Sequence, residues 1–218
     1  MTKVFLKRKI ASRIANGHPW IFGNEVGRID GAVNAGDIVE VYYADEKFCG
    51  RGYINPKSQI IVRLLSRKKE DINEQFFYNR ILEAWNYRKK LGYTENCRLI
   101  FGEADQMPAL IIDKFNDHFV LQTLAYGMDV WKPAIITALQ RIFQPKGIYE
   151  RNDVPVRELE GLPQHKGFLS DPFDTNITIT ENGLKFHVNI ENGQKTGYFL
   201  DQQDNRRAIQ HLVKDAEV

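Results

Sequence analysis

The chain has 218 residues, which suits one or two domains, and its 43% hydrophobic and 27% charged residues are enough for ordinary buried cores. No apolar run approaches the roughly 18 residues of a membrane helix, and the N-terminus lacks the apolar stretch of a secretory signal. We therefore expect no membrane partner. The two cysteines, Cys49 and Cys97, lack metal-ligand spacing, so we expect neither a metal site nor a disulfide framework. A reducing, cytoplasmic location is the simplest interpretation.

Basic residues are concentrated in the first third of the chain. Residues 1–70 contain 13 Lys and Arg against 7 Asp and Glu, a net charge of +6, whereas the remainder carries −4. A small basic domain beside a mildly acidic one indicates an N-terminal module that faces a polyanion. A solvated basic surface is an equally weighted alternative.

Short strands are predicted along residues 1–70, at 4–6, 38–43, 50–54 and 60–65, with a short helix over 9–15 that ends near Asn16-Gly17. Strands this short and close together favour a compact β-barrel or sandwich. The polar run at 66–71 marks a boundary to the next domain.

Residues 72–190 mix helices and strands. Asp71 and Glu74 have capping-box spacing. Phe77, Ile81 and Trp85 then recur at helical intervals, so a helix is predicted over 72–91, with a second over 128–143. Strands are predicted at 97–101, 109–113, 119–124 and 147–151, and a hairpin at 177–190 turns at Asn182-Gly183. The order lacks the regular strand–helix alternation of a doubly wound sheet.

Two motifs in the basic domain suggest contact with RNA. In His18-Pro-Trp-Ile-Phe-Gly23, Trp20 and Phe22 could stack on unpaired bases, although a core role for these aromatics is the favoured alternative. In Gly50-Arg-Gly-Tyr-Ile-Asn-Pro-Lys-Ser58, Arg51 or Lys57 could contact RNA, while the two glycines are interpreted as structural.

A third motif lies in residues 102–113. Its carboxylates Glu103 and Asp105 could perform acid–base chemistry or bind a cation. No third ligand lies near them in the sequence, so a structural turn is favoured.

A fourth motif, residues 149–157, contains Arg151 and Arg157. Both could contact phosphate, or they could pair with Asp153, Glu158 or Glu160. The sequence leaves both alternatives open.

The most informative segment is Gly193-Gln-Lys-Thr-Gly-Tyr-Phe-Leu-Asp-Gln-Gln-Asp-Asn-Arg206, which combines glycines, aromatic rings and hydrogen-bonding groups. Together with the motifs at 18–23, 50–58 and 149–157, it resembles the S-adenosylmethionine (SAM)-dependent methyltransferases that modify cytosine C5 in large-subunit ribosomal RNA. That family consists of a PUA domain, a middle domain and a Rossmann-like catalytic domain. Gln203 departs from the pattern, because the family usually has Arg there, and a charge-assisted ligand contact is then in doubt.

The resemblance implies an α+β fold class. We expect a PUA-like RNA-binding β-barrel over 1–70, an α+β middle domain over 72–190 with a mixed antiparallel sheet and two helices, and a lead-in segment over 191–218. The chain lacks a glycine-rich turn after a first Rossmann strand. A Rossmann-like methyltransferase domain is therefore expected downstream and absent from this chain.

The resemblance also implies site residues. Those predicted to bind the cofactor SAM are Lys195, Tyr198, Phe199, Asp201 and Arg206. Those predicted to bind RNA are Lys7, Arg8, Arg13, Trp20, Arg51, Lys57, Arg151 and Arg157. No catalytic residue and no metal ligand are predicted in this chain.

The implied function is methyl transfer from SAM to cytosine C5 of 23S ribosomal RNA by the full-length protein. This chain alone is expected to be inactive and not to bind SAM, contributing instead RNA docking and one wall of the site. The alternatives are a free-standing RNA-binding adaptor without catalysis and a protein–protein scaffold. The modified nucleotide and the oligomeric state stay open, a homodimer included.

Overall fold

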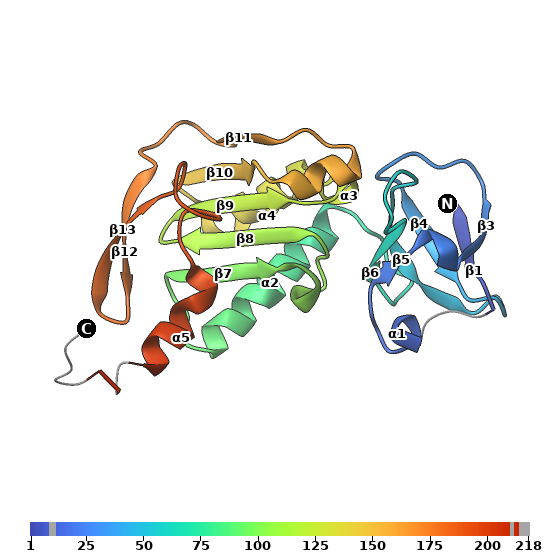
Figure 1. Ribbon diagram of the computed structural model, residues 1–218, viewed down its shortest axis with the longest axis horizontal. Helices are drawn as coiled ribbons and strands as arrows, with labels where there is room; N and C mark the ends of the chain where they lie inside the picture. The colour runs from blue at the N-terminus through green and yellow to red at the C-terminus, as the bar shows by residue number, and fades with distance from the viewer. Residues whose placement is uncertain (9–11, 210–211, 214–218) are drawn as a thin grey trace.

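The computed structural model describes residues 1–8, 12–209 and 212–213, which form a smaller N-terminal body and a larger second body (Figure 1). The helix predicted over 9–15 begins outside the described residues, and α1 spans Ser12–Ala15 within them. No helix in these ranges is long and apolar enough to cross a membrane. The predicted domain boundaries at 1–70, 72–190 and 191–218 stay predictions.

The N-terminal body is built on one six-stranded sheet with the order β2-β6-β5-β4-β1-β3. Strands β1 and β4 are parallel, and the other neighbouring pairs are antiparallel. Its core contains Val4, Ile21, Val41 and Ile54. The strands are β1 (Lys3–Leu6), β2 (Trp20–Ile21), β3 (Val26–Asp30), β4 (Ile38–Tyr42), β5 (Phe48–Ile54) and β6 (Val62–Ser66), with the 3₁₀ helix η1 (Gly23–Glu25) before β3.

The structural interpretation of the glycines in β5 is confirmed. A Cβ atom on Gly52 would lie 2.1 Å from the carbonyl oxygen of Arg63 in β6, and one on Gly50 would lie 2.6 Å from that of Ser66. The two strands approach closely beside a bulge at Arg51 and Gly52. Only glycine fits between them.

The second body contains a five-stranded sheet with the order β11-β10-β9-β8-β7 and a separate hairpin of β12 and β13. The strands are β7 (Asn96–Phe101), β8 (Leu110–Phe115), β9 (His118–Thr123), β10 (Gly147–Asn152), β11 (His165–Phe168), β12 (Asn176–Glu181) and β13 (Leu184–Asn189). The helices are α2 (Glu74–Lys90), α3 (Tyr126–Val130), α4 (Lys132–Phe143) and α5 (Gln203–Ala208), with 3₁₀ helices η2 (Gly102–Asp105), η3 (Pro155–Glu160) and η4 (Leu200–Gln202).

The two faces of the five-stranded sheet are covered differently. Phe119 and Leu121 of β9 face the core with α2 and α4, while the intervening Val120 joins a second cluster with the hairpin and Leu200. In Figure 1, α2 and α4 lie behind the sheet and the chain leading to α5 crosses its front. The sheet therefore separates a helix-covered face from a face that carries the Gly193–Arg206 segment.

Helix boundaries differ from the predicted ones for local reasons. Asn73, not Asp71, caps α2, because its side chain accepts the backbone N–H of Phe76 at 3.0 Å. The helix predicted over 128–143 divides into α3 and α4 at Trp131. Pro133 lies in the first turn of α4, where its missing N–H is tolerated. The predicted hairpin turn at Asn182-Gly183 is confirmed, with φ of 51° and 81°.

The predicted fold class is wrong in its description of the sheet and helices. Strands β9 and β10 are parallel, joined by a crossover through α3 and α4, and β11 adds an antiparallel edge. Within residues 72–190 the structure has three α-helices, α2 to α4, instead of two, because the second predicted helix divides at Trp131. Strand pairing of this kind is set by contacts distant in sequence, which local patterns do not report.

The two bodies are joined by a buried carboxylate. Glu160, at the end of η3, is only 3% exposed and accepts Arg63 at 2.8 Å, Ser58 at 2.5 Å and Asn55 at 3.0 Å, all from the N-terminal body. Burial opposes its ionisation, but the Arg63 pair and the two hydrogen bonds outweigh this and lower the pKa of Glu160. The ionised carboxylate therefore holds the two bodies together.

Close packing reinforces this junction. The hydroxyl of Tyr53 in β5 donates to the carbonyl oxygen of Pro108 at 2.9 Å. Its ring lies so close to α3 that a Cβ atom on Gly127 would come within 2.1 Å of it. The indole N–H of Trp20 donates to Glu103 at 2.7 Å, a third contact between the bodies.

We predict that Glu160→Ala lowers the free energy of unfolding by about 3–5 kcal/mol, because it leaves Arg63 buried without its partner. Urea unfolding at neutral pH measures the change, and Glu158→Ala, at an exposed position two residues earlier, is the matched control. Since the pKa of Glu160 is lowered, its contribution is present above the unfolded pKa and is lost as the pH falls through the folded one. Equal effects of the two substitutions would contradict the proposed junction.

Candidate functional site

The Gly193–Arg206 segment crosses the sheet face opposite α2 and α4, and three strands anchor it. Arg151 in β10 donates to the carbonyl oxygens of Ile190 at 2.7 Å and Gly193 at 3.0 Å. The hydroxyl of Thr196 donates to Asp113 in β8 at 2.5 Å. Asp113 is fully buried and forms a bidentate pair with Arg98 in β7, with both distances 2.9 Å. The segment is thus fixed by side chains of the sheet.

The glycines of this segment permit close backbone packing. A Cβ atom on Gly193 would lie 2.4 Å from the carbonyl oxygen of Gly197 and 2.5 Å from that of Asn189. Gly197 itself has a φ of +118°, which side chains rarely adopt. The glycines therefore allow a tightly folded turn.

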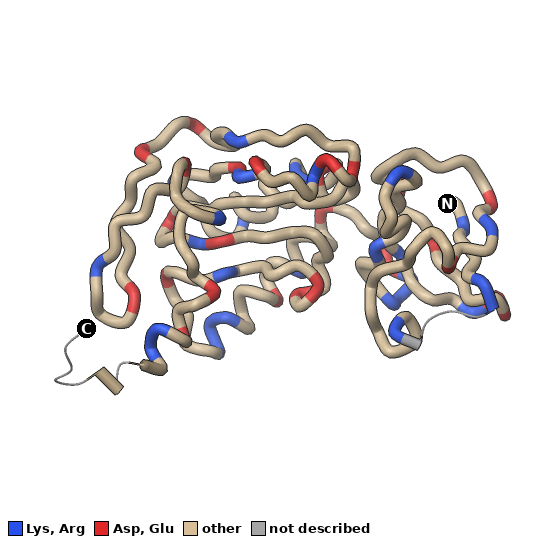
Figure 2. Tube along the Cα trace, viewed as in Figure 1, with Lys and Arg blue, Asp and Glu red and all other residues tan. Residues whose placement is uncertain are grey.

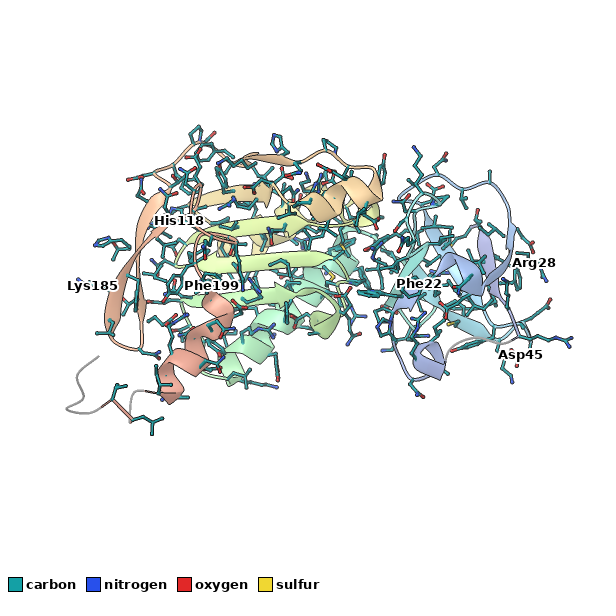
Figure 3. The ribbon with its side chains drawn as sticks, viewed as in Figure 1. Phe22, Arg28, Asp45, His118, Lys185 and Phe199 are labelled. Atoms are coloured by element: carbon teal, nitrogen blue, oxygen red, sulfur yellow. The ribbon has the colours of Figure 1, made fainter. Side chains whose placement is uncertain are left out.

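Three of the predicted cofactor residues form one accessible group. Lys195 pairs with Asp201 at 3.0 Å, and its ammonium lies 4.4 Å from the centre of the Phe199 ring. Burial opposes ionisation of Asp201, but the hydrogen bond from Lys195 and the charge of Arg98 at 3.8 Å outweigh it and lower its pKa. Phe199 lies in front of the sheet in Figure 3. This group combines a cation, an anion and an aromatic ring on a fixed backbone.

The other two predicted cofactor residues are turned toward the hairpin. Arg206 forms a bidentate pair with the buried Glu181 at 2.6 and 2.7 Å, and the hydrogen bond to Glu181 raises the pKa of Arg206. The ring of Tyr198 lies 4.6 Å from the Arg206 guanidinium and packs on Phe186. Both side chains hold β12 and β13 against the segment, and their role toward a cofactor stays a prediction.

A pocket of about 240 Å³ opens beside this segment and is lined by Arg88, Leu91, Tyr93, Cys97, Arg98, Phe101, Leu200 and Asp201. Small-molecule sites usually measure about 300–1,000 Å³, so this pocket would contact only part of a nucleoside-sized ligand. The side-chain oxygen of Gln203 is not part of this pocket and is buried without a hydrogen-bond partner among the described residues. The aromatic rings and the carboxylate that line the pocket fit one part of a ligand that carries a ring, hydroxyls and an amine.

The predicted RNA-binding residues do not form a single surface. Lys7 and Arg8 are exposed and line an open pocket of about 680 Å³ that also contains Lys47. Lys57 is exposed on the turn after β5. Figure 2 shows lysines and arginines in both bodies. The +6 charge of residues 1–70 is therefore spread around the N-terminal body.

The remaining predicted RNA-binding residues of the N-terminal body are engaged within the protein. Arg51 pairs with Glu40 at 2.8 Å and with Asp71 at 3.1 Å. Arg13 pairs with Glu25, and Trp20 donates to the second body. Their part in RNA binding stays a prediction.

Arg151 and Arg157 are both buried. Arg151 pairs with Asp153 at 3.0 Å, one of the alternatives that the sequence left open. Arg157 pairs with Asp129 at 3.0 Å and donates to the carbonyl oxygens of Thr123 and Pro163. The two side chains are 9% and 3% exposed, and their role in RNA binding stays a prediction.

The structure also accounts for the paired carboxylates and the cysteines. Glu103 accepts Trp20, and Asp105 accepts Arg88 at 2.6 Å, so both are engaged structurally, and no metal-binding cluster occurs within the described ranges. Burial raises the pKa of Cys97 to about 12 and also raises that of Cys49. Neither thiol is suited to act as a thiolate nucleophile at neutral pH.

Sequence reasoning did not identify the partners of three buried acids. Asp113, Glu160 and Glu181 each accept from an arginine that is between 15 and 97 residues away in the sequence. The only sequence signal is a carboxylate within an apolar strand, as in Leu-Ile-Ile-Asp113. The partners are identifiable only in the folded chain.

Comparison with known proteins finds a PUA-like domain and relatives that are named as methyltransferases. Residues 4–67 match the family model of a PUA-like domain. The chain is 38% identical over 220 residues to "Ribosomal RNA large subunit methyltransferase I" of Vibrio vulnificus, covering 99% of this chain and 55% of that protein. The protein of the same name from Serratia proteamaculans is 38% identical over 96% of this chain and 54% of its own length. The chain is therefore homologous to these proteins and spans about half of their length.

Two solved structures share the fold. A protein from Streptococcus mutans, provisionally described as a SAM-dependent methyltransferase, aligns with a TM-score of 0.75 and 20% identity over 96% of this chain and 54% of its own. A second, provisionally described as a methyltransferase and complexed with SAH, aligns with a TM-score of 0.76, also at 20% identity. These likenesses concern the fold alone.

The comparisons also overturn the prediction of an absent Rossmann-like domain. The aligned structures are methyltransferases by description, and 96% of this chain lies within their folds. These alignments do not show that a domain is missing, so the predicted absence of a Rossmann-like domain is not supported. The expectation that this chain alone is inactive likewise has no support from them.

We predict that Arg151→Met loosens the Gly193–Arg206 segment, because two backbone carbonyls lose a charged donor. Amide hydrogen exchange over residues 193–200 should accelerate roughly ten- to hundredfold. Arg207→Met, at an exposed arginine next to this segment, is the control and should leave the exchange unchanged. Unchanged exchange in Arg151→Met would show that the segment is held by other contacts.

Proposed function

We propose that this chain docks ribosomal RNA and supplies part of the cofactor site of a SAM-dependent methyltransferase that acts on cytosine C5 of 23S ribosomal RNA. The observation that carries the proposal is the 38% identity, over 99% of the chain, to a protein named as a large-subunit ribosomal RNA methyltransferase. The anchored Gly193–Arg206 segment adds a structural reason, because its charged and aromatic groups are held in fixed positions.

The RNA-docking part of the proposal rests on the N-terminal body. That body contains the PUA-like domain at 4–67, and residues 1–70 carry a net charge of +6. Lys7, Arg8 and Lys57 are exposed cations that phosphates can approach. We leave the buried Arg151 and Arg157 out of this proposed surface, since their donors are used within the protein.

The cofactor part rests on Lys195, Phe199 and Asp201. SAM supplies an electrophilic methyl group when it is bound. The Asp201 carboxylate can accept hydrogen bonds from hydroxyl or amine groups, and the Phe199 ring offers an apolar surface to a nucleobase. Tyr198 and Arg206 are positioning residues in this proposal, because they hold the segment through Glu181.

The proposed chemistry also assigns a limited role to the described residues. Methylation at cytosine C5 requires prior attack on the ring by a nucleophile, for which a thiolate is suited. Cys49 and Cys97 are buried with raised pKa values, so we assign that step to neither. Two reduced cysteines agree with the proposed cytoplasmic location, where ribosomal RNA is found.

We predict that Lys7→Gln combined with Arg8→Gln weakens binding to a 23S ribosomal RNA fragment and lowers its salt dependence. Loss of two phosphate contacts should reduce the slope of log K against log salt by roughly one to two. Fluorescence anisotropy across a salt series measures the slope, and Lys185→Gln with Arg207→Gln in the second body is the matched control. A wild-type chain without RNA affinity at any salt concentration would favour the protein scaffold.

Deletion of the gene in its source organism should remove one 5-methylcytidine from 23S ribosomal RNA, and the reintroduced gene should restore it. Mass spectrometry of nuclease fragments identifies both the nucleoside and its position. Loss of a different modified nucleoside would contradict the C5 assignment. Unchanged modification combined with salt-dependent RNA binding would favour the RNA-binding adaptor.

A further inference from the structure

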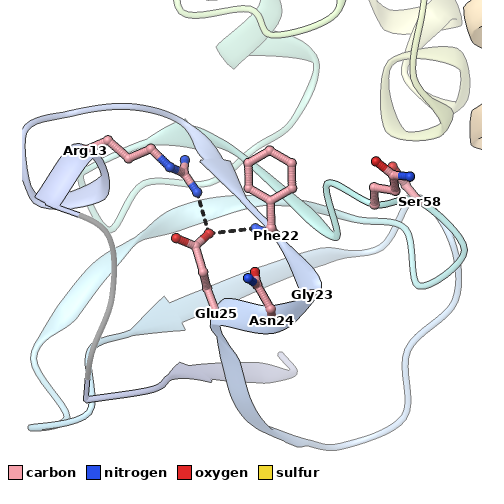
Figure 4. A pocket seen from close by; sticks show the side chains of 7 residues that line it. Arg13, Phe22, Gly23, Asn24, Glu25 and Ser58 are labelled. Atoms are coloured by element: carbon pink, nitrogen blue, oxygen red, sulfur yellow. Dashed lines mark hydrogen bonds and ion pairs between the residues drawn. The ribbon is translucent and has the colours of Figure 1, made fainter.

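A second pocket, separate from the Gly193–Arg206 segment, lies on the N-terminal body. Its volume is about 570 Å³, and it is lined by Arg13, Phe22, Gly23, Asn24, Glu25, Ser58 and Gln59 (Figure 4). The pocket forms where the chain leaves β2 through η1 and meets the turn after β5. Its lining contains no residue of the proposed cofactor group and neither Lys7 nor Arg8. Of the predicted RNA-binding residues, Arg13 lines this pocket.

Phe22 is the aromatic group of this pocket. Its neighbour Ile21 is fully buried in the core, whereas Phe22 is half-buried and belongs to no core cluster of the described residues. Figure 4 shows its ring standing between Arg13 and Ser58. Trp20 does not line the pocket, and its indole N–H donates to Glu103. Phe22 is therefore the ring of this motif that faces the pocket.

The guanidinium of Arg13 lies 4.9 Å from the centre of the Phe22 ring and is held in place. It donates to Glu25 at 2.5 Å and to the carbonyl oxygen of Trp20 at 2.6 Å. Glu25 also accepts the backbone N–H of Phe22 at 2.8 Å. The ion pair neutralises the local charge, so the pocket suits a neutral planar group better than a phosphate.

Two amide side chains stand at the rim of the pocket. Asn24 and Gln59 are exposed, and neither side chain has a hydrogen-bond partner within the part of the chain that is described. An amide carries both donors and an acceptor, which is what the edge of a nucleobase requires. Lys57, two residues before Gln59, is an exposed cation on the same turn.

We propose that this pocket binds one unpaired nucleobase of single-stranded RNA. The base stacks on Phe22 beside the Arg13 guanidinium, while Asn24 and Gln59 contact its edge. Unpaired bases in RNA are typically recognised by this combination of stacking and edge hydrogen bonds. The inference rests on the proposed RNA-docking function and adds to it a single-stranded element in the substrate.

The test compares two probes, an oligoribonucleotide of about ten nucleotides and its abasic counterpart with the same phosphates. Phe22→Leu should weaken binding of the base-containing probe roughly five- to hundredfold and leave the abasic probe unaffected. Phe22→Trp should retain binding, because it restores an aromatic face. Phe168→Leu, at a half-exposed ring in β11 of the second body, is the matched control and should change neither probe.

Further measurements separate this inference from the function on which it rests. Asn24→Ala with Gln59→Ala should reduce the differences in affinity among oligo(A), oligo(C) and oligo(U), while thermal unfolding shows that the fold is retained. An abasic probe that binds wild-type protein as tightly as the base-containing probe would overturn the pocket. It would leave RNA docking intact if a 23S ribosomal RNA fragment still bound with steep salt dependence.

Discussion

The buried pair of Glu160 and Arg63 is the interaction on which the arrangement of this protein depends. It joins a 3₁₀ helix of the second body to the sheet of the first, and a buried carboxylate tolerates only an arrangement that supplies all of its partners. This pair helps to fix the N-terminal body, which carries the proposed RNA-docking surface, relative to the Gly193–Arg206 segment. Under the proposed function, an RNA that docks on that body would meet the segment in a defined orientation.

Carboxylate–arginine pairs with a buried carboxylate also occur at the candidate site. The buried Asp113, paired with Arg98, accepts the Thr196 hydroxyl of the segment, and the buried Glu181 pairs with Arg206 at the end of the segment. Such pairs fix geometry because a displaced partner leaves a buried charge uncompensated. The residues left accessible between them, Lys195, Phe199 and Asp201, therefore present their groups from a rigid base.

The sequence was a good guide to local elements and a poor guide to their pairing. Helical spacing of Phe77, Ile81 and Trp85 correctly predicted α2, and Asn182-Gly183 correctly predicted a hairpin, because both signals act within a few residues. The parallel pairing of β9 with β10 and the edge strand β11 were missed. At the site, sequence motifs identified the right segment, but they could not distinguish the accessible Asp201 from Arg206, which is turned to Glu181.

The sequence by itself determined the PUA-like character of residues 4–67, the basic first third and the motif at 193–206. These are properties of composition and short-range order. Only the tertiary structure decided that Trp20 bridges the bodies while Phe22 faces a pocket, and that Arg151 and Arg157 are buried while Lys7 and Arg8 are not. The reason is physical, since an arginine binds a phosphate or a buried carboxylate through the same donors, and only the fold determines which acceptor it meets.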